Sequence, residues 1–142
     1  MFSVSGHWTC RFFIEAGELF LRIMNERWKV AETEANAIAK LLRKHGLEKG
    51  KVLDLMCGNG RISINLAKLG YKVVGIDISP MYIEDARGRA KEHNVAEDVK
   101  FLVGDECMFC QNSELCIQRS SNKNISTKNL GKIWQPHSSS RK

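Results

Sequence analysis

The sequence of 142 residues suits one domain with a hydrophobic core of its own. Its formal net charge of +6 comes from 22 Lys and Arg against 16 Asp and Glu. The charge is concentrated at one end, since residues 111–142 hold six of the basic residues and only one of the acidic residues. Because the first 110 residues are nearly neutral, the composition does not support a nucleic-acid-binding surface on the part predicted to fold.

No apolar run in the sequence reaches the length of a transmembrane helix, so no membrane anchor is expected. Residues 1–14 lack the basic start and the apolar block of a secretory signal. The five cysteines are an odd number, which is more typical of reduced thiols than of a set of disulfides. These features together predict a cytoplasmic protein.

Residues 1–50 are predicted to form a helical N-terminal segment. Apolar residues recur at helical spacing over residues 11–24 and again over residues 31–42, with a break near Trp28. The pattern predicts two amphipathic helices, and the second of them is expected to end at Gly46 after a basic last turn.

The most informative stretch is the run Val-Leu-Asp-Leu-Met-Cys-Gly-Asn-Gly at residues 52–60. Its first five residues are apolar except for Asp54, which is typical of a buried parallel strand, and Gly58 and Gly60 then indicate a tight turn. Residues 61–69 carry apolar positions at helical spacing, and a glycine follows them. A strand, a glycine turn and a helix in this order present bare backbone and the N–H groups of a helix N-terminus to a ligand.

Two further strands continue this pattern. Residues 71–76 are a β-rich run that ends at Asp77, and the Ser-Pro pair that follows is typical of a helix start. A third β-rich run over residues 99–103 ends in Gly-Asp. Strands that alternate with helices predict a parallel α/β sheet with right-handed connections, and such sheets bind ligands at the carboxyl ends of their strands. Five residues fall near these ends: Asp54, Gly58, Gly60, Asp77 and Asp105.

The three strand ends resemble the first three motifs of the class I S-adenosylmethionine-dependent methyltransferases. The first motif of that family commonly reads Asp-Leu-Gly-Cys-Gly-x-Gly, and residues 54–60 match it except that Met56 replaces the first glycine. The ends Val-Gly-Ile-Asp at 74–77 and Leu-Val-Gly-Asp at 102–105 match the second and third motifs, in the right order. The resemblance implies a Rossmann-like fold in which residues 51–110 are the cofactor-binding core.

The resemblance also implies S-adenosyl-L-methionine as the cofactor and methyl transfer as the reaction. Asp77 is then expected to hold the ribose hydroxyls, and Asp105 is expected to bond the adenine amine. Gly58 and Gly60 are expected to admit the methionine part. The cofactor-binding set is completed by Asp54, Met56, Cys57 and Ile78. The family further permits an N-terminal helix to lie over the cofactor as a lid.

A nicotinamide or flavin dinucleotide is the alternative ligand, because its sites share the strand, the glycine turn and the helix. The dinucleotide fingerprint requires a third glycine three residues after the second, and that position is Ser63. Asp54 would also repel a pyrophosphate, whereas it suits a ligand that carries an ammonium and a sulfonium. Both observations favour S-adenosylmethionine.

The sequence identifies no catalytic residue, because methyl transfer from a sulfonium depends mainly on holding the donor and the acceptor in line. Cys57 is interpreted as a small packing residue of the turn. Cys107, Cys110 and Cys116 have metal-like spacing but no fourth ligand near them, so no metal site is predicted.

Residues 111–142 contain seven serines and four asparagines without clear periodicity, which predicts a poorly ordered tail. The family's pattern continues with a fourth strand whose end faces the transferred methyl, and no such strand is readable in this tail. The expected function is therefore S-adenosylmethionine-dependent methyl transfer to an unknown acceptor. The alternative is a truncated, non-catalytic, cofactor-binding fragment of such an enzyme.

Overall fold

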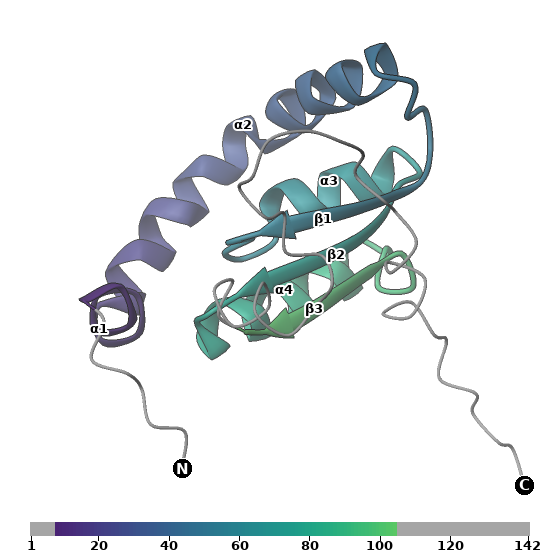
Figure 1. Cartoon of the computed structure of the whole chain (residues 1–142). Coiled ribbons are helices and arrows are strands. Elements are labelled where there is room, and N and C mark those ends of the chain that lie inside the picture. Colours follow the sequence, from purple (N-terminus) through teal and green to yellow (C-terminus); the bar gives the residue numbers. More distant parts are fainter. Residues whose placement is uncertain (1–7, 105–142) are drawn as a thin grey trace, which may run out of the picture. The chain divides into compact units, whose positions relative to one another are not determined.

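The computed structural model describes residues 8–104, which form four helices and three strands (Figure 1). The helices are α1 (Trp8–Glu15), α2 (Gly17–Lys44), α3 (Arg61–Lys68) and α4 (Pro80–Glu92). The strands are β1 (Lys51–Leu55), β2 (Lys72–Asp77) and β3 (Val99–Val103). After the two N-terminal helices the order of elements is β1-α3-β2-α4-β3, as the sequence predicts.

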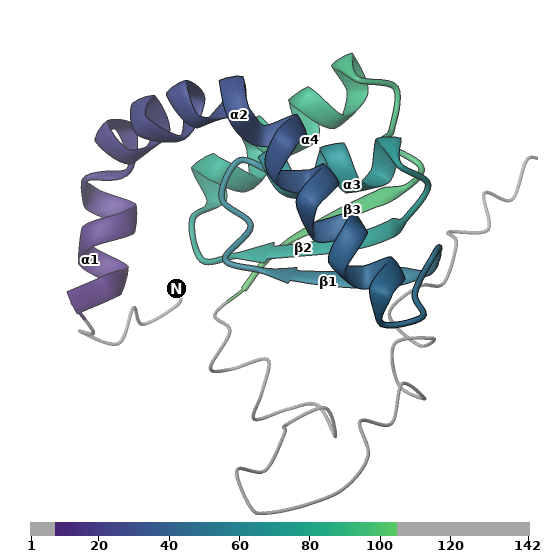
Figure 2. The same ribbon diagram turned by 90° about the horizontal axis from the view of Figure 1, so that it is seen from above.

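The three strands form one parallel sheet in the order β1-β2-β3. Leu53 pairs with Val74, and Gly75 pairs with Phe101, so the strands end side by side. Right-handed connections between neighbouring strands place both connecting helices on the same face of the sheet. Figure 2 shows α3 and α4 on that face, with α2 running past them.

The core lies between β2, its neighbouring strands and these helices. β2 is the central strand, and all its side chains from Val73 to Asp77 are buried. Phe101 of β3 and Ile64 of α3 are also buried in the same cluster, together with Ala35 of α2. The fold that positions the strand ends is therefore held by apolar burial on one face of the sheet.

The break between the two N-terminal helices is not where the sequence pattern predicts it. The expected break near Trp28 is wrong, because α2 continues without interruption from Gly17 to Lys44. No glycine or proline follows Gly17 until Gly46, so nothing in the backbone chemistry interrupts the helix at Trp28. The actual break is at Ala16, and the carbonyl of Gly17 accepts a hydrogen bond from the Tyr82 hydroxyl of α4 at 3.0 Å.

The C-terminal end of α2 agrees with the prediction. Arg43 and Lys44 form its basic last turn, and Gly46 follows with a φ of +87°.

Residues 105–142 lie outside the described residues. They include Asp105, the three cysteines Cys107, Cys110 and Cys116, and the predicted tail. The division of the chain into segments 1–50, 51–110 and 111–142 stays a prediction. None of the helices within residues 8–104 has both the length and the apolar character needed to cross a bilayer.

Candidate cofactor site

The turn after β1 is built from left-handed backbone at three alternate positions. Met56, Gly58 and Gly60 have φ values of +57°, +55° and +76°. The N–H of Cys57 between them donates to the carbonyl of Ile76 at 3.0 Å, which ties the turn to the end of β2. Left-handed backbone suits glycine, and this explains why two of the three positions carry it.

Met56 is the exception among these three positions. A left-handed conformation costs an ordinary residue about 1–2 kcal/mol, and the Met56 side chain is 70% exposed. The strand predicted over residues 52–56 ends at Leu55 for the same reason, since Met56 has left the extended conformation. Met56 therefore stands, strained, where the family commonly has the first glycine of its motif.

Asp77 joins the end of β2 to the glycine turn. One oxygen of its carboxylate, Oδ2, accepts the N–H of Gly58 at 2.8 Å, and the other, Oδ1, accepts the N–H of Ser79 at 3.0 Å. The residue is 7% exposed, and Ile78 beside it is half-buried. The carboxylate thus fixes the turn after β1 and the start of α4 at the same point of the sheet edge.

Asp54 lies in β1 and receives a hydrogen bond of 2.6 Å from the Ser63 hydroxyl of α3 to its Oδ2. Burial raises the pKa of the Asp54 carboxyl, and the negative charge of Asp77 adds to this, whereas Ser63 and the Arg61 charge act in the opposite direction. Ser63 occupies the position of the third dinucleotide glycine, and its contact with Asp54 gives that position a different role. The sequence did not reveal this role.

Cys57 is a buried member of the core cluster. Burial raises the pKa of its thiol, and the carboxylates of Asp54 and Asp77 raise it further, so the thiol stays protonated near neutral pH. A Cβ placed at Gly75 would lie 2.9 Å from the Cys57 sulfur, which shows how closely the thiol packs on β2. This burial agrees with the interpretation of Cys57 as a packing residue of the turn.

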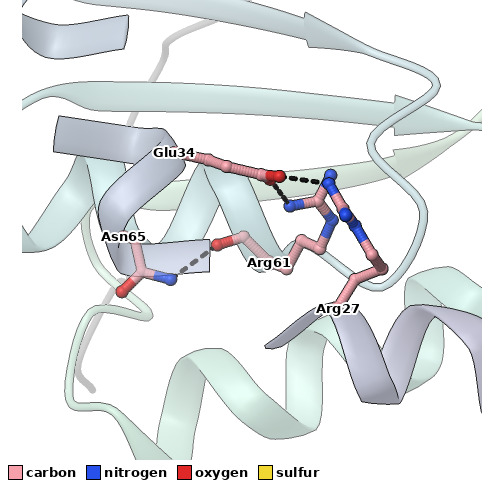
Figure 3. Close-up of polar contacts among 4 residues, drawn as sticks. All are labelled: Arg27, Glu34, Arg61 and Asn65. Atoms are coloured by element: carbon pink, nitrogen blue, oxygen red, sulfur yellow. Dashed lines mark hydrogen bonds and ion pairs between the residues drawn. The ribbon is translucent and has the colours of Figure 1, made fainter. Parts of the chain in front are cut away.

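Helix α2 makes two polar contacts with the turn region that the sequence pattern did not reveal. Asn25 Oδ1 accepts the side-chain N–H of Asn59 at 3.0 Å, and Asn59 is fully buried between the two turn glycines. Further along α2, Glu34 pairs with Arg61, the first residue of α3, and with Arg27 (Figure 3). Asn25 and Asn59 lie 34 positions apart and Glu34 and Arg61 lie 27 positions apart, so local spacing does not show that they meet. Arg27, in contrast, lies in α2 itself, 7 positions from Glu34.

The expected cofactor residues within the described part of the chain gather at one edge of the sheet. Hydrogen bonds join Gly58 to Asp77 and Asp54 to Ser63, and the Asp77 charge acts on Asp54 and Cys57. Gly60 plays a different part from Gly58, because a Cβ placed there would lie 2.5 Å from the ring of Phe101. Gly60 therefore permits close packing of the turn on β3.

The parallel sheet, the glycine turn after β1 and the acidic end of β2 form the arrangement that the motif resemblance implies. Residues 47–120, just over half of the chain, match the family described as "Methyltransferase domain", and the chain belongs to that family. The Rossmann-like fold implied by the sequence motifs is thereby confirmed.

Individual relatives cover parts of the chain. It is 42% identical over 65 residues to the ribosomal protein L11 methyltransferase of Thermus thermophilus. The matched stretch covers 46% of this chain and 25% of that protein. It is also 32% identical over 96 residues to the release factor glutamine methyltransferase of Dictyoglomus turgidum. This match covers 65% of this chain and 30% of that protein. The chain thus spans less than a third of the length of either relative.

A solved structure from Methanococcus maripaludis, described as a candidate S-adenosyl-L-methionine-dependent methyltransferase, has a TM-score of 0.57 to this chain. The identity is 21%, and the match covers 72% of this chain and 45% of that one. At this identity the likeness shows the shared fold.

Proposed function

We propose that this chain binds S-adenosyl-L-methionine at the carboxyl edge of its sheet and transfers the methyl group to an acceptor. The contact between the Asp77 carboxylate and the Gly58 N–H, at 2.8 Å, carries the proposal. It brings the acidic end of β2 and the glycine turn after β1 to one point, and these are two of the three motifs that resemble the family. Membership of the methyltransferase domain family supports the same function.

The residues present fit this ligand. The Asp77 carboxylate supplies oxygen acceptors, which ribose hydroxyls can bond, and its two backbone contacts hold it at the end of β2. Gly58 lacks a Cβ at the point where the methionine part would approach. Asp54 provides a carboxyl group near the same turn for the ammonium end. Met56, Cys57 and Ile78 would border the ligand through their positions in the two turns, and Asp105 remains the proposed partner of the adenine amine.

When bound, S-adenosyl-L-methionine supplies an activated methyl group on a sulfonium. The task of the chain is to hold this donor in a fixed orientation, which can account for a large part of the acceleration when an acceptor lies in line. Asp77 and the turn backbone would do the orienting. The acceptor and the residues that face it are open, and we propose a cytoplasmic location on the basis of the odd number of cysteines.

A dinucleotide fits the structure less well. Asp54 lies in the strand that leads into the glycine turn, so a pyrophosphate at this turn would meet its carboxyl group. Ser63 donates to Asp54 and thereby keeps that carboxylate at the turn. The carboxyl group of Asp54 at the turn favours a ligand that carries positive charge there.

Calorimetric titration of the full chain tests the proposal. S-adenosylhomocysteine, the demethylated product, is expected to bind, and NAD is expected not to bind. Asp77→Asn should weaken S-adenosylhomocysteine binding roughly 10- to 100-fold, because a hydrogen bond to a charged group contributes ~1.5–3 kcal/mol.

Asp98→Asn is the matched control for this titration. Asp98 is likewise an aspartate that forms a contact, in this case an ion pair with Lys72, but it lies at the opposite edge of the sheet. Its variant should therefore bind S-adenosylhomocysteine like the wild type. Tighter binding of NAD than of S-adenosylhomocysteine would overturn the cofactor assignment. An unchanged affinity of a folded Asp77→Asn variant would remove Asp77 from the site.

A further inference from the structure

The space beside Gly58 is filled by a side chain from another helix. A Cβ placed at Gly58 would lie 2.5 Å from the sulfur of Met24 in α2 and 3.8 Å from its methyl carbon. Within residues 8–104, and apart from the neighbours of Gly58 in the turn itself, no other atom comes within 4 Å of that point. Any ligand group that uses the missing Cβ of Gly58 must therefore take the place that the Met24 thioether holds.

Gly58 differs in this respect from the other two crowded glycines of the sheet edge. A Cβ at Gly60 would meet the Phe101 ring and the methyl group of Ala86, and a Cβ at Gly75 would meet Phe101 and Cys57. These neighbours are buried members of the core cluster, so they cannot withdraw without disturbing the fold. Met24 is half-buried, and its unbranched side chain can change conformation about three bonds. Of these three spaces, only the one at Gly58 can be vacated by a side-chain rotation.

The backbone of α2 is held in place on both sides of Met24. Asn25 accepts hydrogen bonds from Asn59 of the turn at 3.0 Å and from Arg89 of α4 at 2.7 Å. The carbonyl of Gly17, two turns earlier, accepts the Tyr82 hydroxyl at 3.0 Å. These contacts fix the helix over the turn, so the movable part is the Met24 side chain and not the whole helix.

We propose that Met24 controls access of the cofactor's methionine part to Gly58. It covers Gly58 in the free protein and turns aside when S-adenosyl-L-methionine binds. This inference rests on the proposed function, since it assigns a side chain to the same cofactor site. When the competent conformer is only fractionally populated, the apparent affinity falls by that fraction. Met24 thus lowers the affinity for ligands that reach Gly58 and leaves other ligands unaffected.

Titration of Met24→Ala with two ligands tests this role. S-adenosylhomocysteine carries the amino-acid part that would reach Gly58, whereas adenosine lacks it. Met24→Ala should bind S-adenosylhomocysteine about tenfold more tightly than the wild type, as expected for an occluding conformer populated at about 90%. Its affinity for adenosine should not change. Leu41→Ala is the matched control, because Leu41 is a 56% exposed apolar residue of the same helix, far from the turn.

The outcomes separate the inference from the proposed function. Equal or weaker binding of S-adenosylhomocysteine by Met24→Ala, with binding by the wild type, would overturn the role of Met24 alone. Absence of binding by both proteins would overturn the proposed function and this inference with it. Binding by Met24→Ala alone would support both.

A second measurement uses the wild-type protein and does not depend on how a variant folds. With carbon-13-labelled methionine methyl groups, the Met24 resonance can be assigned by its loss in Met24→Leu. Addition of S-adenosylhomocysteine should shift this resonance, because its methyl group leaves the contact with Gly58, and addition of adenosine should leave it in place. A Met24 methyl resonance whose chemical shift stays the same when S-adenosylhomocysteine binds would contradict the proposal.

Discussion

The two halves of α2 contact the rest of the domain in different ways. In residues 31–44, Ala31, Ala35 and Ala39 have no exposed surface, and this half packs against α3. In residues 17–30, Leu19 is 59% exposed and Ile23 is 52% exposed, whereas Met24 and Trp28 are partly buried. The C-terminal half therefore has a row of fully buried alanines, whereas the N-terminal half meets the domain through partly buried side chains.

The difference lies in the size and spacing of the side chains. Alanines four residues apart lie on one face of a helix, and their small volume lets the backbone of α2 come close to α3. Residues 17–30 are held to the turn by Met24 and by the hydrogen bonds of Asn25 instead. The C-terminal half therefore contributes mainly to stability, and the N-terminal half lies against the glycine turn.

Ala35→Leu should have the largest effect on stability among the changes considered in α2. The added atoms have no space at a fully buried alanine, and overpacking of this kind costs typically about 1–3 kcal/mol. We expect the free energy of unfolding, measured by urea denaturation, to fall by about 3 kcal/mol.

Ile23→Ala, in the N-terminal half of α2, is the matched control for Ala35→Leu. Because Ile23 is already half in solvent, its truncation should change the free energy of unfolding by no more than about 0.5 kcal/mol. If the two variants lost similar stability, the contrast between the halves of α2 would be wrong.

The sequence predicted most of what local chemistry determines. The apolar runs before Gly58 and Asp77 revealed β1 and β2, and the glycine turn revealed the sheet edge, because these signals lie within a few residues. The break at Ala16 was missed although Gly17 beside it is a local signal, since glycine is a poor helix former. The contacts of Met24 and Asn25 with the turn were missed because the direction in which α2 crosses the turn decides them.

Asn25→Ala should have an intermediate effect, and it tests the polar attachment of the N-terminal half. The change removes the acceptor of the Asn59 amide, and Asn59 is fully buried. A buried donor without a partner costs ~1–3 kcal/mol, and we expect a loss near the lower end because Asn25 itself is exposed to water.

Asn25→Asp is the control for this change, since its carboxylate can still accept from Asn59 and Arg89. Urea denaturation should show wild-type stability for Asn25→Asp and a loss for Asn25→Ala. Equal stability of all three proteins would mean that the hydrogen bond does not hold α2 on the turn.

Glu34→Gln should have the smallest effect on stability of the changes in α2, and this effect should depend on pH. The hydrogen bond from Arg61 is the largest influence on the Glu34 carboxyl and lowers its pKa below the ordinary value of 4.5, and the charges of Arg61 and Arg27 act in the same direction (Figure 3). A carboxyl group with a lowered pKa in the folded state stabilises the fold above the pKa of the unfolded chain. This contribution is lost as the pH falls through the folded pKa, because protonation removes the charge that holds both arginines.

Glutamine at position 34 does not titrate, so the wild type should be more stable than Glu34→Gln at pH 7, and the two should converge as the pH drops below 4.5. Thermal unfolding at several pH values measures this convergence. Added salt at pH 7 should reduce the stability difference between the two proteins, because the network is partly exposed to solvent.

Glu26→Gln is the comparison within the N-terminal half of α2. Glu26 pairs with Lys29 at 2.5 Å, but both side chains are 73% exposed, so its replacement should change stability less at pH 7. A stability difference for Glu34→Gln that stays constant between pH 7 and pH 3 would show that the carboxylate charge does not join the C-terminal half of α2 to α3.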